Sequence, residues 1–437
     1  MKYLKFIVIF IMLIRLSLES SYYEEGKRAY DEKDYKRAIH YFKNSKSEYS
    51  NINMQSLWAE SEKALDRVDY MMAAYERILN IEPRNFEIAY NLINLYKGYG
   101  LEKEIRKVIS NFDFNDYLPQ ERSILVKFLT TDYMNLNKFS VNFINEIGYD
   151  SDIISYENST NNFFELPLEN SVGSPFCKTK LFTSYIYDLS NKGNWFIEAD
   201  IDFIQKSNFN EAFYDLRFVR VSPKLGYKIA NKIISIPIYY EYTYDLGRNL
   251  IQNYGFKPTL STLLDSNHVF NFSLISSKKE YLPDGMDIYN SYSYGVSSSL
   301  HYIFSKLQAV VNISYLKNSA QNRTDDVLKP KYIDNKILNL AVDVKYRFRY
   351  AYMITANSKI VLKDFDEKLV LVNQINEKYL SNDKRRETYC EFGLGLSRNL
   401  SKRIKIISNF NYSINVSPYK EAEYDRIMSS IGLEYNF

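Results

Sequence analysis

The sequence predicts an α + β chain with two domains, an N-terminal domain of α-helical repeats and a C-terminal antiparallel transmembrane β-barrel of about 14 strands. Apolar residues follow a helical period, with a repeat of about 33 residues, in the first third of the chain, and they alternate with polar residues after it. Aromatic residues make up 16% of the 437 residues, yet mean hydropathy is −0.37. This polar average excludes a helical membrane protein, whereas a barrel needs apolar side chains on only one face of each strand.

Residues 1–20 have the pattern of a secretory signal peptide. Two lysines precede the apolar run Phe6–Ile14, which is too short to span a bilayer. Small residues follow it, so we expect cleavage near Ser20. Arg15 is unusual in such a segment and leaves an uncleaved membrane anchor as the alternative.

Residues 21–135 are predicted to form helical repeats. Gly26, Ala59 and Ile93 occupy equivalent positions in the first helices of three units. The pattern resembles the tetratricopeptide (TPR) repeat, in which small residues let paired helices approach and aromatic residues fill the gaps. Three units are near the minimum for a stable stack. We expect a further helix, from near Pro119 to about Tyr133, to cap it.

Such stacks bind peptides or proteins on a concave face, so the inner positions of the first helices are candidate partner contacts. These positions are Tyr23, Lys27, Tyr30, Glu60, Lys63, Tyr90, Asn94 and Lys97. The alternative is a spacer domain on which the same residues are merely solvated.

Residues 138–437 alternate as a barrel wall does. Trp195, Ile197 and Ile201 point one way, and intervening acidic residues point the other way. Polar positions of this kind are expected to line the lumen: Glu198, Asp200, Asp202, Arg217, Asp343, Lys345, Arg347, Glu391 and Glu434. Their mixed signs favour a water-filled or plugged lumen over a selective ion track.

Turn signals divide this region into about fourteen strands. Short turns are expected at Asn191–Asn194, Asn231, Asp265–Asn267, Ser305, Arg349–Ala351 and Ser401–Lys402. Longer polar connections are expected at 157–173, 206–213, 246–252, 282–288, 317–332, 364–384 and 417–423. Short and long connections alternate, as the periplasmic turns and external loops of outer-membrane barrels do. A soluble antiparallel sandwich is the alternative and would have shorter strands.

The sequence ends on alternating apolar residues that include Tyr435 and Phe437. This ending resembles the terminal-strand signal that barrel-assembly machinery reads in outer-membrane proteins. The resemblance implies that machinery as a partner.

No motif indicates catalysis, and we expect no enzyme activity, metal or cofactor. His40, His268 and His301 fall in different predicted elements. The formal net charge is only +3, so no nucleic-acid partner is expected. Cys177 and Cys390 are expected to be isolated strand residues, and a single disulfide is the alternative.

Repeats placed directly before a barrel of this size are similar to the surface lipoprotein assembly modifier family. A barrel-opening motif with Gly148, Asp150 and Ser151 is similar to that family's Gly-Tyr-x-x-Asp-Ser-Asn-Val-Asn pattern, although Asp152 stands where the family has Asn. The resemblance implies an outer-membrane location with the repeats in the periplasm. It also implies that the repeats bind a lipoprotein or small secreted protein and that the barrel provides its passage. The partners would be this cargo and outer-membrane lipids, and we expect a monomer.

Two alternatives remain open. An exopolysaccharide export porin also joins repeats to a barrel, but usually has more repeats and a lumen with aromatic and acidic residues that contact sugar. A structural or adhesion barrel with a protein-docking domain is the other. The highly charged connection 364–384 is expected to be a solvated external loop, which is compatible with it.

Overall fold

The computed structural model describes residues 22–112, 138–153, 172–189, 194–210, 212–245, 248–282, 290–304, 306–321, 334–349, 352–372, 378–401, 403–418 and 423–437. Backbone contacts divide the chain into two compact units, Met1–Asp116 and Tyr117–Phe437. The expected signal peptide and the expected capping helix lie outside the described residues.

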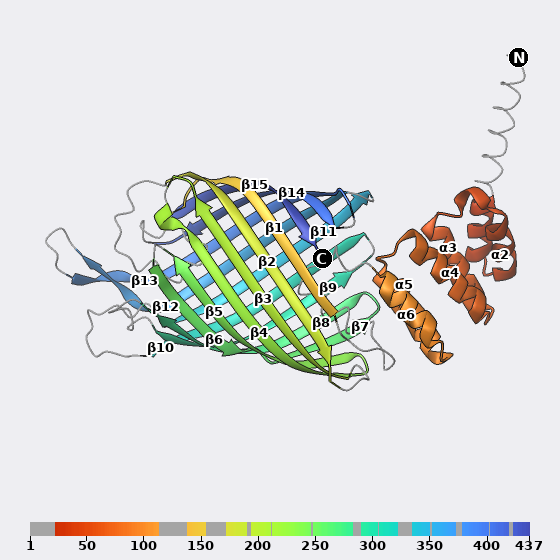
Figure 1. Cartoon of the computed structure of the whole chain (residues 1–437), viewed down its shortest axis with the longest axis horizontal. Helices are drawn as coiled ribbons and strands as arrows, with labels where there is room; N and C mark the ends of the chain where they lie inside the picture. Colours follow the sequence, from red (N-terminus) through yellow and green to blue (C-terminus); the bar gives the residue numbers. More distant parts are fainter. Residues whose placement is uncertain are drawn as a thin grey trace, which may run out of the picture. The chain divides into compact units, whose positions relative to one another are not determined.

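The first unit is helical (Figure 1). Residues 22–31 form its first described helix, and the others are α2 (Tyr35–Asn44), α3 (Ile52–Ala64), α4 (Val68–Ile81), α5 (Phe86–Gly98) and α6 (Glu102–Asn111). Helix starts follow the local sequence, because Asp34, Asn51 and Asn85 each accept a backbone N–H bond from the first turn of the helix that follows. No helix among the described residues is long and apolar enough to cross a bilayer.

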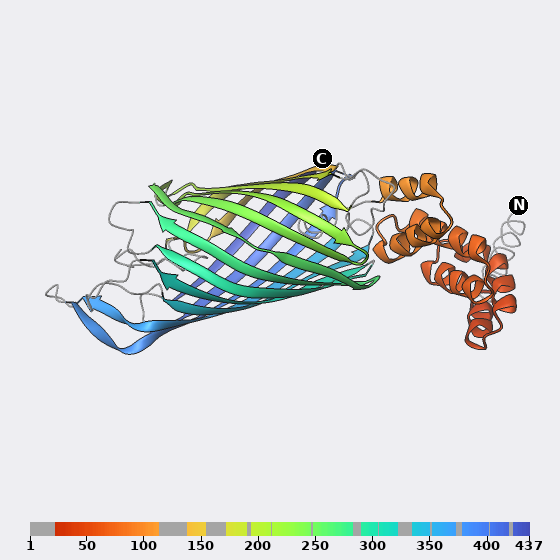
Figure 2. The same cartoon turned by 90° about the horizontal axis from the view of Figure 1, so that it is seen from below.

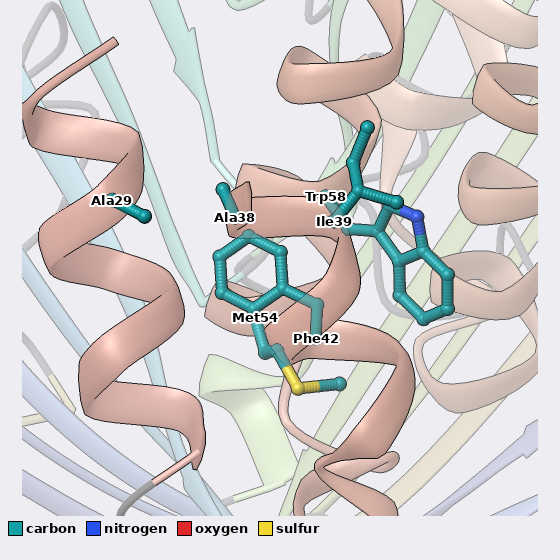
Figure 3. Close-up of a cluster of buried hydrophobic side chains, with 6 residues drawn as sticks. All are labelled: Ala29, Ala38, Ile39, Phe42, Met54 and Trp58. Atoms are coloured by element: carbon teal, nitrogen blue, oxygen red, sulfur yellow. The ribbon is translucent and has the colours of Figure 1, made fainter. Parts of the chain in front are cut away.

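The core of this unit forms where successive helices meet (Figure 3). One buried cluster contains Ala29, Ala38, Ile39, Phe42, Met54 and Trp58. Gly26 lies against this cluster, and a Cβ atom there would come within 2.6 Å of the Phe42 ring. The equivalent positions Ala59 and Ile93 are also buried. Close helix packing therefore explains why a small residue opens the first repeat.

The second unit is a closed antiparallel barrel (Figures 1 and 2). Its strands are β1 (Lys138–Asp150), β2 (Ser174–Asp188), β3 (Trp195–Asn208), β4 (Leu216–Ile229), β5 (Lys232–Asp245), β6 (Arg248–Phe256), β7 (Thr259–Asp265), β8 (His268–Tyr281), β9 (Ser291–Ile303), β10 (Leu307–Ala320), β11 (Asn335–Arg349), β12 (Tyr352–Val372), β13 (Lys378–Asn399), β14 (Ile404–Val416) and β15 (Tyr424–Asn436). β1 pairs with β15, which closes the sheet. β6 and β7 follow one another between β5 and β8. β6 and β7 lie end to end and together occupy one strand position, so the fifteen segments make fourteen strand positions. The predicted fourteen-stranded barrel is confirmed, and the sandwich is excluded.

The two faces of the wall alternate as predicted. On β3, Trp195 and Ile197 are 47% and 42% exposed, whereas Phe196 and Glu198, which alternate with them, are fully buried. Exposed apolar side chains continue round the outer face through every strand pair, for example at Ile238, Ile313 and Ile431. A closed barrel with such an outer surface is stable in a bilayer and not in water. The second unit is therefore a membrane-spanning barrel of the outer-membrane type.

Several expected loops are corrected. The connection 246–252 is not long, because β5 ends at Asp245 and β6 begins at Arg248. β12 and β13 continue into the expected loop 364–384 as a paired hairpin that extends past the other strands (Figures 1 and 2). Likewise β3 and β10 continue into 206–213 and 317–332. Beyond the bilayer both faces of a strand contact water, so the alternation that reveals a strand disappears there.

Other expectations agree with the described residues. Short turns follow β4 at Asn231 and β7 at Asp265–Asn267. Cys177 and Cys390 are free thiols on β2 and β13, which are not neighbouring strands. Both thiols lie on the outer face, because Cys177 pairs with Ile147 and Cys390 with Ile360. The expected disulfide alternative is therefore wrong.

Candidate functional site

The inner face of the barrel carries most of the predicted lumen residues. Strand register places Glu198, Asp200, Asp202, Asp343, Lys345, Arg347, Glu391 and Glu434 on this face. Arg217 is a correction. It pairs with Gln205 and Tyr244 and shares the outer face with Val219, and its guanidinium lies 5.4 Å from the centre of the Tyr244 ring. Arg217 lies close to one end of β4, where a polar residue is tolerated on the outer face. Polarity therefore does not show which face a residue occupies there.

Three inner-face carboxylates bind cations across the closing seam, which we define as the β1–β15 pair and its inner-face partners. Lys180 Nζ lies 2.6 Å from the Glu146 carboxylate, which also accepts a bond from Asn409. Lys405 Nζ lies 3.1 Å from Glu434. Asp150 is fully buried and forms ion pairs with Lys206 and Arg426.

The barrel-opening motif belongs to this seam. A Cβ atom at Gly148 would overlap the Ser429 carbonyl oxygen of β15 and come within 2.7 Å of the Phe176 ring. Ser151 extends the pairing beyond β1, because its N–H donates to the Ile427 carbonyl at 2.9 Å and its hydroxyl accepts the Ile427 N–H at 2.8 Å. Each residue of the motif therefore contributes to the contact between β1 and β15 that closes the barrel. Sequence reasoning found the motif but missed the cations Lys206 and Arg426, which are far from it in the chain.

Tyr435 and Phe437, the expected assembly signal, lie on the outer face at the same seam. The Phe437 N–H donates to the Val141 carbonyl at 2.9 Å, and the Tyr435 ring lies 6.3 Å from the Phe143 ring. The terminal aromatic residues thus contact the first strand directly.

A polar cavity of about 290 Å³ occupies part of the lumen. Its lining is dominated by small hydroxyl and amide side chains: Ser140, Asn142, Thr183, Ser184, Ser222, Ser235, Thr259, Ser261, Asn271, Ser273, Ser297, Ser299 and Asn312. The predicted acidic residues of β3 line it too, and Lys224 Nζ lies 3.3 Å from Glu198 and also pairs with Asp200. The cations Arg220, Lys224 and Lys257 also line the cavity and were missed from sequence.

A second part of the inner face is apolar. Ile337, Val361 and Tyr389 form a buried cluster, with Leu316 and Tyr424 packed against it. Beside it, Glu387 binds both Arg385 and Lys363, with the Lys363 Nζ at 3.6 Å. The Tyr389 hydroxyl donates to the predicted lumen residue Glu391 at 2.9 Å. This part of the lumen therefore combines a group of paired charges with buried rings.

The eight predicted partner contacts lie on the helix of residues 22–31, on α3 and on α5. We call these eight residues the first-helix face. Lys27, Lys63, Asn94 and Lys97 are exposed, and the Tyr30 hydroxyl donates a hydrogen bond to Glu60 of the next repeat. That bond, with burial, raises the pKa of Tyr30 to about 12. Tyr23 and Tyr90 are partly buried, Tyr23 against the core cluster and Tyr90 stacked on Phe86. The structure thus joins Tyr30 and Glu60 and leaves the lysines accessible.

The sequence matches no family model and no curated protein. Among solved structures, the chain is similar to a loop L8 deletion mutant of OmpT, an outer membrane protein of Vibrio cholerae, at 7% identity and a TM-score of 0.39, over 69% of this chain and 99% of that one. It is also similar to an anion-selective porin from Comamonas acidovorans, at 9% identity and a TM-score of 0.39, over 70% and 100%. A bacterial polysaccharide outer membrane secretin follows at 10% identity and a TM-score of 0.34, over 69% and 99%. At these scores only the residues of this chain can decide between functions.

Proposed function

We propose that the chain is an outer-membrane translocator that moves or displays a surface lipoprotein or small secreted protein. In this proposal the helical repeats bind cargo in the periplasm, and the barrel provides the passage. The observation that carries it is the first-helix face, an accessible surface with excess positive charge on a domain that precedes a membrane-spanning barrel. A barrel that acted as a pore alone would not need such a surface.

The chemistry of this face indicates the kind of segment it binds. Lys27 and Tyr30, Glu60 and Lys63, and Asn94 and Lys97 are each three residues apart, so each pair shares one side of its helix. Three lysines against one glutamate favour an acidic peptide segment, and the glutamate is already engaged by Tyr30.

Polysaccharide export is less well supported by the lumen. Stacking on sugar requires accessible aromatic faces, yet four inner-face rings, Phe176, Phe196, Phe365 and Tyr389, are 5% exposed or less. Among the described residues, Phe182 alone of the phenylalanine, tyrosine and tryptophan side chains lines the polar cavity. The inner carboxylates Glu146, Asp150 and Glu434 are neutralised by cations instead of being available to hydroxyl groups.

The test reverses the charge of the first-helix face in the full chain. We expect the Lys27→Glu, Lys63→Glu, Lys97→Glu variant to assemble a normal barrel and to lose surface display of the cognate lipoprotein, measured by protease accessibility on intact cells. The matched control changes three exposed lysines of the second helices, Lys36→Glu, Lys103→Glu and Lys107→Glu, and should leave display unchanged.

Deletion of residues 22–135 should likewise leave a barrel but abolish display. Display that persists unchanged in either variant contradicts the translocator proposal. Loss of matrix sugar with normal display of surface proteins would favour polysaccharide export instead.

A further inference from the structure

The backbone ladder of the barrel is interrupted in the middle of neighbouring strand pairs. Between β4 and β5 the ladder skips residues 222–223, although the register is the same on both sides of this gap. The pairing of β5 passes from β6 to β7 at 236–237, and the pairing of β8 does so at 274–275. None of these gaps shifts the register, and among the described residues the other interruptions lie towards strand ends or in the β12–β13 extension. Backbone pairing is therefore weakest, at mid-strand, between β4 and β8.

Three prolines cause this weakness: Pro223 in β4, Pro237 in β5 and Pro258 between β6 and β7. We call this region the proline wall. Lys257 donates its N–H to the Pro237 carbonyl at 3.0 Å, and Leu274 donates to the Pro258 carbonyl at 3.0 Å. A pair of this kind normally exchanges two bonds, but proline has no N–H to return the second. Prolines are rare inside a sheet, so a cluster of three in adjacent strands marks a feature of the wall.

The two sides of the proline wall differ in chemistry. Its inner side is part of the polar cavity, to which Ser235, Pro237, Lys257, Thr259 and Ser261 contribute. Its outer side is apolar and exposed, with Leu225, Ile236, Ile238, Leu260 and Leu274 facing the bilayer. One layer of incompletely bonded backbone therefore separates a polar cavity from lipid.

The cavity also holds Lys257, a cation that stands outside the ion pairs of its neighbours. Lys224 is paired with Glu198 and Asp200, and Arg220 lies 3.7 Å from Glu241. No described carboxylate lies within 4.0 Å of the Lys257 ammonium in the same cavity. An ammonium in a cavity lined largely by hydroxyl and amide groups suits a phosphate or another anionic head group.

We propose that the proline wall is a lateral portal for an amphiphile with an anionic head group. The head group binds in the cavity beside Lys257, and the apolar tail leaves through the weakened ladder into the bilayer. The inference deepens the proposed function and rests on it for the cargo, since a lipid-anchored protein must bring its acyl chains into the membrane. Binding of the amphiphile itself can be measured without any cargo.

The test uses the full chain in phosphatidylcholine vesicles with a photoactivatable lysophosphatidic acid as the probe. In a Cys177→Ser, Cys390→Ser background, Ile238→Cys and Phe256→Cys place a disulfide across β5 and β6, whose Cα atoms are paired there. Ile313→Cys and Leu340→Cys place a matched disulfide across the uninterrupted β10–β11 pair. Labelled residues are identified by mass spectrometry after heat-dependent gel mobility has shown that the barrel is folded.

We expect cavity residues to be labelled in the parent and in the β10–β11 variant. Oxidation of the β5–β6 variant should lower this labelling about tenfold, and reductant should restore it. Lys257→Gln should also lower it about tenfold, because the hydrogen bonds of a charged group are lost. If a disulfide variant does not fold, Pro237→Val with Pro258→Val restores both missing donors and should lower labelling in the same direction.

Cavity labelling that is absent, or equal in the oxidised and reduced β5–β6 variant, overturns the portal. Equal labelling by a lysophosphatidylcholine probe overturns the anionic head group. Competition by soluble glycerol phosphate as strong as that by the unlabelled lipid would show a plain phosphate site and overturn the amphiphile. Loss of labelling with normal lipoprotein display would refute the portal alone, whereas normal labelling without display would refute the proposed function alone.

Discussion

The closing seam and the proline wall are built in opposite ways. At the seam, nine successive residue pairs from Asn142 to Asp150 bring β1 against β15, and buried ion pairs reinforce them from inside. At the proline wall, successive pairs lose a backbone donor, and no described carboxylate pairs with Lys257. Stabilising contacts are therefore distributed unevenly round the barrel wall. They are concentrated where the first and last strands pair, and backbone hydrogen bonds are fewer where the cavity adjoins the lipid-facing surface.

We expect the greatest loss of stability from a variant that removes a buried anion of the closing seam. Asp150→Ala leaves Arg426 and Lys206 buried without their anion, which should cost about 3–5 kcal/mol of unfolding free energy. Urea unfolding from vesicles, followed by heat-dependent gel mobility, measures it. The control is Asp425→Ala, which removes the same charge from an exposed neighbour on β15 and should change little. Equal costs in the two variants would show that burial at the seam is not the cause.

The next effect concerns the backbone contact at the same seam. Gly148→Ala should destabilise the barrel by about 1–3 kcal/mol, because the added methyl group meets β15 backbone and the Phe176 ring. The same urea titration applies. Gly98→Ala is the matched change in the helical unit, where nothing lies within 4 Å, and it should be neutral or stabilising. A neutral Gly148→Ala would mean that β1 and β15 can separate without cost.

At the proline wall the sign should reverse. Pro237→Val with Pro258→Val supplies two new N–H donors, each worth about 1 kcal/mol, and part of that gain is lost to a more flexible unfolded chain. We expect a small net gain in stability, together with the reduced lipid labelling described above. Pro175→Val at the end of β2 is the control and should not affect labelling. A loss of stability with unchanged labelling would remove the contrast between the two regions.

We expect the smallest change in stability at a partly exposed contact of the helical unit, the hydrogen bond between Tyr30 and Glu60. Tyr30→Phe removes the bond to Glu60 and should cost less than about 1 kcal/mol near pH 8. The native pKa of Tyr30 is raised to about 12 from 10, so the bond contributes stability below about pH 10 and loses it as pH rises towards 12. Circular dichroism of thermal unfolding should therefore show wild type and variant converging at alkaline pH. A difference that stays constant from pH 8 to 11.5 would contradict this assignment.

Sequence patterns predicted the barrel because membrane and lumen impose a two-residue period that is visible at Trp195 and Ile197. The same rule failed at Arg217 and beyond Asp364, where strands leave the apolar layer and polarity no longer reports the face. The acidic lumen positions could be found by parity alone. The cations Lys180, Lys206 and Arg426, which pair with Glu146 and Asp150 at the closing seam, could not be found, because such pairing depends on the register between distant strands. The three prolines were visible in the sequence, but only the sheet order places them side by side.

The pairing of β1 with β15 also bears on how the barrel can form. Asp150 and Arg426 are 276 positions apart in the chain, so this ion pair cannot form until the final strand has been made, whereas Lys206 of β3 is available to Asp150 earlier. Until then the growing sheet has two open edges with unpaired backbone groups, which are prone to join the wrong neighbour. We therefore expect the pairing of β1 with β15 to be a late step of folding, because it requires the final strand.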